Sequence, residues 1–78
     1  MSADPAEIPT IVGLQLGREE VLPEHRLFED LGAESGDFVA IVAIVEERYG
    51  IFIEEEELPA IRTVADLQRL ARERSSGP

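Results

Sequence analysis

Ser35 is the residue of this chain whose position best suits chemistry at an exposed hydroxyl. It lies where the polar stretch 30–36 gives way to an apolar helical pattern. A helix start offers unpaired backbone N–H groups and the positive end of the helix dipole. An anion attached to Ser35, such as a phosphodiester, would therefore meet favourable electrostatics. Serine is also a preferred N-cap, so the local pattern alone more often indicates an ordinary cap.

The other reactive side chains indicate no catalytic or metal site. The 78-residue chain contains no cysteine, and all seven basic residues are arginine, so a lysine nucleophile is excluded. His25 has no second histidine to help it bind a metal, and we interpret it as a solvated loop residue. The acidic run 54–57 lacks the oxygen-ligand pattern of an EF-hand and is interpreted as a solvated face. No catalytic triad or phosphate-cradling glycine loop is evident, so we expect a non-catalytic protein without a metal.

Composition and charge limit the class of protein. The length predicts one small domain over residues 1–78, ordered from about residue 5 to 74 with polar tails. A net charge of −10 disfavours nucleic acid as a partner and favours partner enzymes with basic patches. No apolar run reaches the length of a membrane span, and no signal peptide is visible. We therefore expect a cytoplasmic monomer.

Hydrophobic spacing predicts an all-α fold. A first helix, capped by Asp4 with Pro5 at its first position, should be loose before Pro9 and end near residues 16–17. A second should run from about Ser35 or Gly36 to residue 49, with Gly50 as its stop. The β-branched residues of that second segment leave a buried strand as the alternative.

The last third of the chain predicts two more helices. Leu58 and Ile61 should anchor a short helix limited by Pro59, and Thr63 with Asp66 resembles a capping box that opens a final helix. A turn of helix is also possible over 27–31, and Val21 and Leu22 should pack against the core. The predicted core comprises Ile11, Leu16, Leu31, Val42, Val45, Ile53, Ile61, Val64 and Leu67.

A resemblance extends this interpretation. Residues 30–35, Asp-Leu-Gly-Ala-Glu-Ser, resemble the Asp-Leu-Gly-x-Asp-Ser signature of acyl carrier proteins, in which the serine carries 4′-phosphopantetheine. Segments 11–17, 27–32, 46–53 and 63–67 are similar to corresponding parts of the family, in register. The resemblance therefore covers nearly the whole chain, from Ile8 to Leu70.

This resemblance implies a small four-helix bundle with three longer helices and one short. It implies a 4′-phosphopantetheine arm on Ser35, flanked by Glu34 and Gly36 and installed from coenzyme A by a phosphopantetheinyl transferase. Acyl or aminoacyl groups would travel on it as thioesters to acyl-loading and acyl-processing enzymes of fatty-acid, polyketide or related biosynthesis. The residues expected to face partner enzymes are Asp37, Val39, Ala40, Ala43, Glu46 and Glu47.

The chain departs from the family pattern at four positions. The family usually has Asp before the serine and Leu after it, where this chain has Glu34 and Gly36. Ala40 stands where the family often has an acid, and Phe38 is bulkier than usual, which we interpret as core packing. Gly36 best favours the alternative that this is a carrier-like helical interaction protein without a cofactor.

Overall fold

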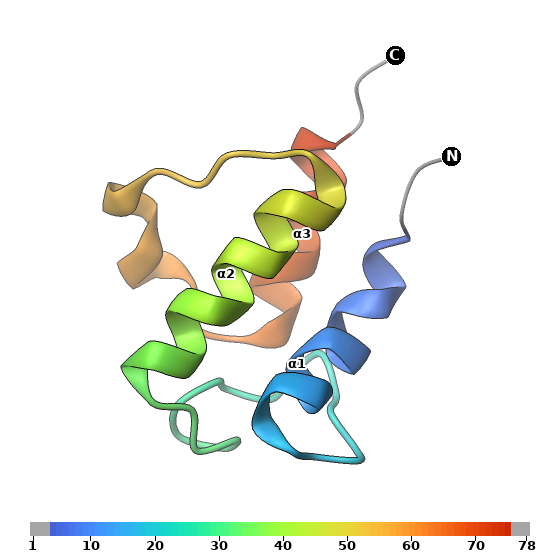
Figure 1. Cartoon of the computed structure of the whole chain (residues 1–78), viewed down its shortest axis with the longest axis vertical. Helices are drawn as coiled ribbons and strands as arrows, with labels where there is room; N and C mark the ends of the chain where they lie inside the picture. The colour runs from blue at the N-terminus through green and yellow to red at the C-terminus, as the bar shows by residue number, and fades with distance from the viewer. Residues whose placement is uncertain (1–3, 76–78) are drawn as a thin grey trace.

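The computed structural model describes residues 4–75, which form three α-helices and two short 3₁₀ helices (Figure 1). Helix η1 (Pro5–Glu7) leads directly into α1 (Ile8–Leu16), and α2 (Ser35–Tyr49) follows a long loop. Helix η2 (Glu55–Ala60) stands apart between α2 and α3 (Val64–Arg74). Each α-helix contacts the other two, which confirms the predicted all-α bundle of three longer helices, and η2 is the short helix predicted before the last one. Within residues 4–75 the only strand-like pairing is an isolated bridge between Arg26 and Thr63.

Local chemistry explains where the helices begin and end. The Asp4 carboxylate accepts a hydrogen bond from Ala6 N–H (3.0 Å), as expected for the cap of η1. Pro9 lies in the first turn of α1, where its missing N–H leaves no helical bond unmade, so the helix accommodates it. Gly50 ends α2 with a φ of 64°, a left-handed conformation that glycine adopts without steric cost.

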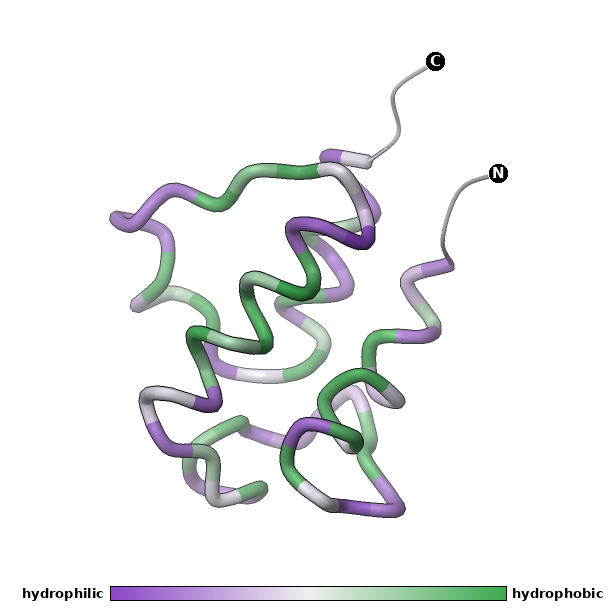
Figure 2. The backbone as a smooth tube through the Cα atoms, in the orientation of Figure 1, coloured by the Kyte–Doolittle hydropathy of each residue, from purple (hydrophilic) through white to green (hydrophobic). Residues whose placement is uncertain are grey.

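The core lies where the three α-helices meet, and α2 carries a hydrophobic inner face along much of its length (Figure 2). Seven of the nine residues predicted for the core are buried, whereas Ile11 and Leu16 are half-buried against it. The largest fully buried side chains come from η1–α1, the loop, α2 and α3: Ile8, Val12, Leu27, Ile41, Val45, Val64 and Leu67.

The loop between α1 and α2 differs from the sequence prediction. Leu22 is 39% exposed, so only Val21 of the predicted pair packs against the core. His25 is a half-buried loop residue, and its Nδ1 accepts a hydrogen bond from Leu22 N–H (3.0 Å). Residues 27–31 form hydrogen-bonded turns and no continuous helix, with Asp30 N–H donating to the Arg26 carbonyl (3.0 Å) and Gly32 N–H to the Phe28 carbonyl (3.1 Å).

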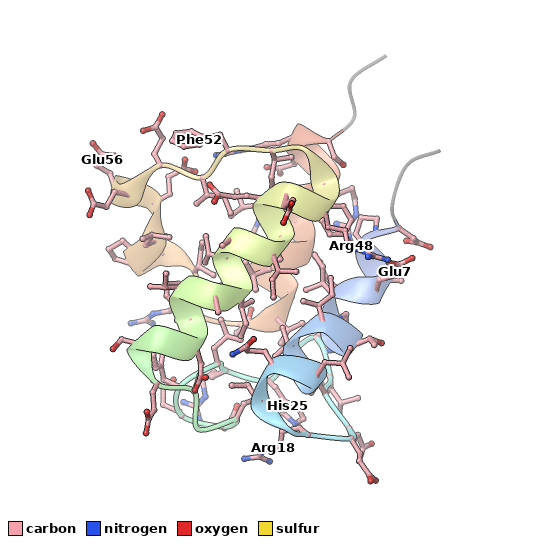
Figure 3. The ribbon with its side chains drawn as sticks, in the orientation of Figure 1. Glu7, Arg18, His25, Arg48, Phe52 and Glu56 are labelled. Atoms are coloured by element: carbon pink, nitrogen blue, oxygen red, sulfur yellow. The ribbon has the colours of Figure 1, made fainter. Side chains whose placement is uncertain are left out.

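Ion pairs connect the periphery of the bundle. Arg48 near the end of α2 points toward Glu7 of η1 (Figure 3), and its Nε lies 3.0 Å from Glu7 Oε1. Arg74 at the end of α3 pairs with Glu57 of η2 and donates to the Phe52 carbonyl (3.1 Å). Glu57 is therefore half-buried and part of a tertiary contact, which corrects the interpretation of 54–57 as a purely solvated face. Within residues 4–75, no helix is long and apolar enough to cross a membrane.

Candidate functional site

The segment before α2 is a tightly bonded turn that delivers Ser35 to the surface. The Asp30 carboxylate accepts hydrogen bonds from Arg26 N–H (2.8 Å) and from the Arg26 guanidinium (3.1 and 3.2 Å). The hydrogen bond from that guanidinium holds the pKa of Asp30 below its ordinary value. Gly32 then turns the chain with a φ of 71°, a conformation that a side chain would strain. The turn closes where Ala33 N–H donates to the Leu27 carbonyl (3.0 Å).

The N-cap of α2 is Glu34. Its backbone is extended (φ −100°, ψ 168°), and its carbonyl accepts a hydrogen bond from Phe38 N–H (2.9 Å). The Asp37 carboxylate reaches back to accept from Glu34 N–H (3.1 Å), which is one half of a capping box. Glutamate and aspartate thus do the capping that an adjacent serine commonly does.

Ser35 is the first residue of α2, and its side chain is exposed. Within residues 4–75 its hydroxyl makes no hydrogen bond, since the cap contacts belong to Glu34 and Asp37. The hydroxyl therefore lies at the helix start, beside the positive end of the α2 dipole, and does not serve as the cap of the helix. This arrangement leaves its oxygen open to an incoming electrophile.

Gly36 leaves the surface beside Ser35 bare. A Cβ built at position 36 would meet no atom within 4 Å, and the residue does not adopt a positive φ. Neither space at the Cβ position nor backbone conformation therefore requires glycine there.

The residues expected to face partners divide into two groups. Val39, Ala43 and Glu47 are exposed along α2, with 61% of Val39 accessible. The other three, Asp37, Ala40 and Glu46, are half-buried.

Two of those half-buried residues have structural contacts that the sequence pattern did not indicate. Besides capping α2, Asp37 accepts a hydrogen bond from Gln15 of α1 (3.4 Å). The Glu46 carboxylate accepts one from Ile53 N–H (2.8 Å), which fixes the chain after α2. These contacts are long-range or cross a turn, so only the folded chain reveals them.

Two aromatic rings pack against each other beside the site, a contact that the sequence did not predict. Phe38, one turn along α2 from Ser35, packs against Phe28 with ring centroids 5.4 Å apart and an interplanar angle of 43°. Phe38 is buried as predicted, whereas Phe28 is 44% exposed. Grooves open on either side of Phe38, toward η2. Phe28 lies in the stretch 27–31, where the sequence indicated only a turn of helix, and nothing in that stretch indicated that its ring would meet Phe38 or stay exposed.

The described residues offer no metal centre. Within residues 4–75, no three histidine, aspartate or glutamate side chains converge as a metal site requires. What the site offers chemically is a hydroxyl nucleophile at a helix start.

Comparison with known proteins agrees with this geometry. A family model described as "Phosphopantetheine attachment site" matches residues 6–70. The "Acyl carrier protein" of Wolinella succinogenes is 45% identical over 56 residues, covering 72% of this chain and 74% of the relative. That of Helicobacter hepaticus is 44% identical over 54 residues, covering 69% and 71%. That of Syntrophobacter fumaroxidans is 38% identical over 69 residues, covering 86% and 85%.

Proposed function

The chain belongs to the phosphopantetheine-carrying acyl carrier protein family, and on this premise we propose that its 4′-phosphopantetheine arm is attached to Ser35. The protein carries acyl groups as thioesters on that arm. Its family consists of non-catalytic carriers that work with partner enzymes, among them a phosphopantetheinyl transferase. We extend this to the present chain, which we infer performs no catalysis of its own.

The observation that carries the assignment is the free hydroxyl of Ser35. The oxygen is exposed, makes no hydrogen bond within residues 4–75, and has open space at Gly36 beside it. Attachment joins this oxygen to the phosphorus of coenzyme A that bears pantetheine, the nucleotide bisphosphate leaves, and the hydroxyl proton passes to solvent. The resulting phosphodiester sits at the positive end of α2. Once bound, the arm supplies the thiol that this cysteine-free chain lacks.

Intact-mass measurement tests this assignment. Apo protein is incubated with coenzyme A, Mg²⁺ and a broad-specificity transferase, and a rise by the mass of one phosphopantetheine group is expected. Ser35→Ala should stay unmodified, whereas the matched control Ser75→Ala should be modified like the wild type. A modified Ser35→Ala would contradict the assignment, and unmodified wild type with several transferases would favour the carrier-like interaction protein.

Partner choice is the finer part of the proposal. We propose that partner enzymes with basic patches dock on the exposed face of α2 formed by Val39, Ala43 and Glu47. Gly36 presents no apolar side chain to them, and burial of a leucine there is worth roughly 1.5–3 kcal/mol. Docking of a general partner should therefore be about tenfold to a hundredfold weaker than for a chain with leucine. The true partner is then a dedicated enzyme.

Gly36→Leu tests this partner proposal at fixed ionic strength, because salt screens the charge attraction. The substitution should raise the rate at which a general transferase modifies Ser35. The variant has room for the new side chain, since a Cβ at this position meets no atom within 4 Å. An unchanged rate and an unchanged affinity for a general synthase would show that position 36 does not select partners.

A further inference from the structure

Phe28 presents an aromatic ring at the surface, in the turn that precedes Ser35. The residue is 44% exposed and follows the fully buried Leu27. Its ring packs against that of Phe38, with the two centroids 5.4 Å apart. Ser35 and Phe38 are three residues apart on α2, and residues at this spacing lie on the same side of a helix. The exposed ring of Phe28 therefore lies close to the start of α2, where Ser35 is.

The Phe28 ring is held in place by its surroundings. The Phe28 carbonyl accepts a hydrogen bond from Gly32 N–H (3.1 Å), within the turn before α2. On the other side, Leu27 N–H donates to the Arg62 carbonyl (2.9 Å), and the buried Phe38 supports the ring itself. A side chain fixed in this way loses little conformational freedom when a partner covers it, so its burial contributes more fully to binding.

The surface around the ring combines apolar and acidic groups. Phe28 lines a groove of about 550 Å³ with four other apolar residues, Phe38, Leu58, Pro59 and Ile61. The same groove carries the charges of Glu29, Glu55 and Arg62, and Glu34 is a further exposed acid beside Ser35. A partner that covers this surface should therefore bring an apolar group to the ring and basic groups to the carboxylates.

The place of the ring indicates which partner covers it. A transferase must bring the phosphorus of coenzyme A to the Ser35 oxygen, so its surface has to lie against the residues around the start of α2. Gly36 provides no side chain for such a contact, whereas Phe28 provides an aromatic ring. A second copy of this chain is disfavoured as the occupant, because two copies that each carry a net charge of −10 repel one another.

We propose that Phe28 is the apolar anchor by which a phosphopantetheinyl transferase holds this chain, in an apolar recess of the enzyme edged by arginine or lysine. The proposal rests on the proposed attachment at Ser35 and names a contact for the enzyme that makes it. Phe28 contributes to binding and takes no part in the transfer itself. Covering the exposed part of the ring should strengthen the complex about threefold to tenfold.

Steady-state kinetics of the modification measure this contact. Apo protein is treated with coenzyme A, Mg²⁺ and a broad-specificity transferase, and intact mass follows the product. Phe28→Ala should raise the KM for the carrier about threefold to tenfold. The kcat should stay unchanged, because the contact is equally strong before and during the chemical step.

Phe52→Ala is the matched control for this experiment. Phe52 is another exposed phenylalanine, with 67% of its surface accessible, but it follows the opposite end of α2 from Ser35 (Figure 3). The same substitution there removes as much aromatic surface without touching the start of α2. The KM of Phe52→Ala should therefore match that of the wild type.

Two further variants keep the proposal testable if Phe28→Ala fails to fold. Phe28→Leu retains an apolar side chain, so its KM should lie between those of the wild type and Phe28→Ala. Phe28→Arg can cover Phe38 with its aliphatic stem, but it places a positive charge against a basic partner. Its KM should rise at least as much as that of Phe28→Ala, and thermal unfolding verifies that each variant is folded.

The outcomes separate this proposal from the attachment on which it rests. A wild type that several transferases leave unmodified would overturn the attachment at Ser35. A modified wild type with the same KM in every Phe28 variant would overturn the anchor alone. An equal rise of KM in Phe52→Ala, or a fall of kcat at constant KM in the Phe28 variants, would overturn it as well.

Two other occupants of this surface are tested with the same variants. Sedimentation that shows a dimer for the wild type and a monomer for Phe28→Ala would assign the ring to self-association. An octanoyl thioester that raises the unfolding midpoint of the wild type but not of Phe28→Ala, with an unchanged KM, would assign it to the cargo. Either result would overturn the anchor, and we expect a monomer and equal midpoint shifts.

Discussion

At the start of α3, the Thr63 hydroxyl accepts a hydrogen bond from Asp66 N–H (3.2 Å), whereas at the start of α2 the Ser35 hydroxyl makes none within residues 4–75. Both helices begin with a capping box that has an aspartate as its third helical residue. In α3 the hydroxyl residue is the cap itself. In α2 the cap is Glu34, and the hydroxyl residue sits one position further in. The shift of one position leaves the Ser35 oxygen without a hydrogen bond within residues 4–75, as the proposed attachment of the arm requires.

The aspartates of these two capping boxes also differ in the number of backbone hydrogen bonds that their carboxylates accept. The Asp66 carboxylate accepts hydrogen bonds from Arg62 N–H (2.9 Å), Thr63 N–H (3.0 Å) and the Arg69 guanidinium (3.0 Å). At the start of α2, the Asp37 carboxylate accepts a single backbone bond, from Glu34. We infer that the start of α3 mainly stabilises the fold, while the start of α2 is only as well capped as presentation of Ser35 requires.

The largest expected effect separates these aspartates. Asp66→Ala removes a carboxylate with several hydrogen bonds, and a hydrogen bond to a charged group contributes about 1.5–3 kcal/mol of net stability. We expect the free energy of unfolding to fall by about 2 kcal/mol in Asp66→Ala and by about 1 kcal/mol in Asp37→Ala. Urea denaturation of both variants measures the difference. Equal losses of unfolding free energy in the two variants would contradict the inferred difference between the starts of α3 and α2.

The pH dependence of the α3 cap should follow from the same carboxylate. Burial raises the pKa of Asp66, but hydrogen bonds from Arg62 N–H, Thr63 N–H and the Arg69 side chain outweigh it, so the pKa is below its ordinary 3.8. A lowered pKa means that the contribution to stability is complete above the unfolded pKa and is lost as pH falls through the folded pKa. The stability difference between wild type and Asp66→Asn should therefore be constant above about pH 5 and shrink below about pH 4. A difference that does not change across this range would contradict it.

The hydroxyls themselves provide the next comparison. Thr63→Ala removes the side chain that caps α3 and should lower the free energy of unfolding by about 1 kcal/mol. Ser35→Ala removes an exposed hydroxyl that makes no hydrogen bond within residues 4–75. The free energy of unfolding should therefore fall by no more than about 0.5 kcal/mol. Thermal and urea unfolding of the two apo variants test this. A loss in Ser35→Ala as large as that in Thr63→Ala would show that Ser35 is a structural cap after all.

The smallest effect concerns Gly36. Because alanine has no steric neighbour at this position and the φ is not positive, Gly36→Ala should stabilise the protein by reducing the freedom of the unfolded chain. A gain of about 0.5 kcal/mol is expected near a helix terminus. Destabilisation measured under the same conditions would mean that glycine is needed for the conformation at the start of α2.

The sequence predicted the parts of this fold that depend on local chemistry. The apolar spacing of α2, its stop at Gly50 and the box of Thr63 with Asp66 are confirmed, because each is set by residues within a few positions of one another. Serine at the α2 start was recognisable as the candidate site. Whether Ser35 or its neighbour would be the cap could not be decided, since serine and acidic residues both suit that role.

The remaining features depend on contacts between distant segments. Leu22 is exposed while Val21 before it packs against the core, and no periodic pattern in this loop encodes that choice. Helix η2 begins at Glu55, earlier than the apolar anchors suggest, and Glu57 is held by Arg74 from the other end of the chain. The grooves beside Phe38 likewise arise only in the folded chain, because residues of α2 and residues of η2 line them together.

Peptide mapping of the modified protein tests the central claim most directly. Cleavage after arginine releases residues 27–48 as one peptide, in which Ser35 is the only residue with a hydroxyl side chain. After treatment with coenzyme A and a transferase, the account predicts that this peptide gains the mass of one phosphopantetheine group while every other peptide keeps its own. An arm found on any other peptide, or an unmodified 27–48 peptide beside a modified family member in the same reaction, would contradict the account.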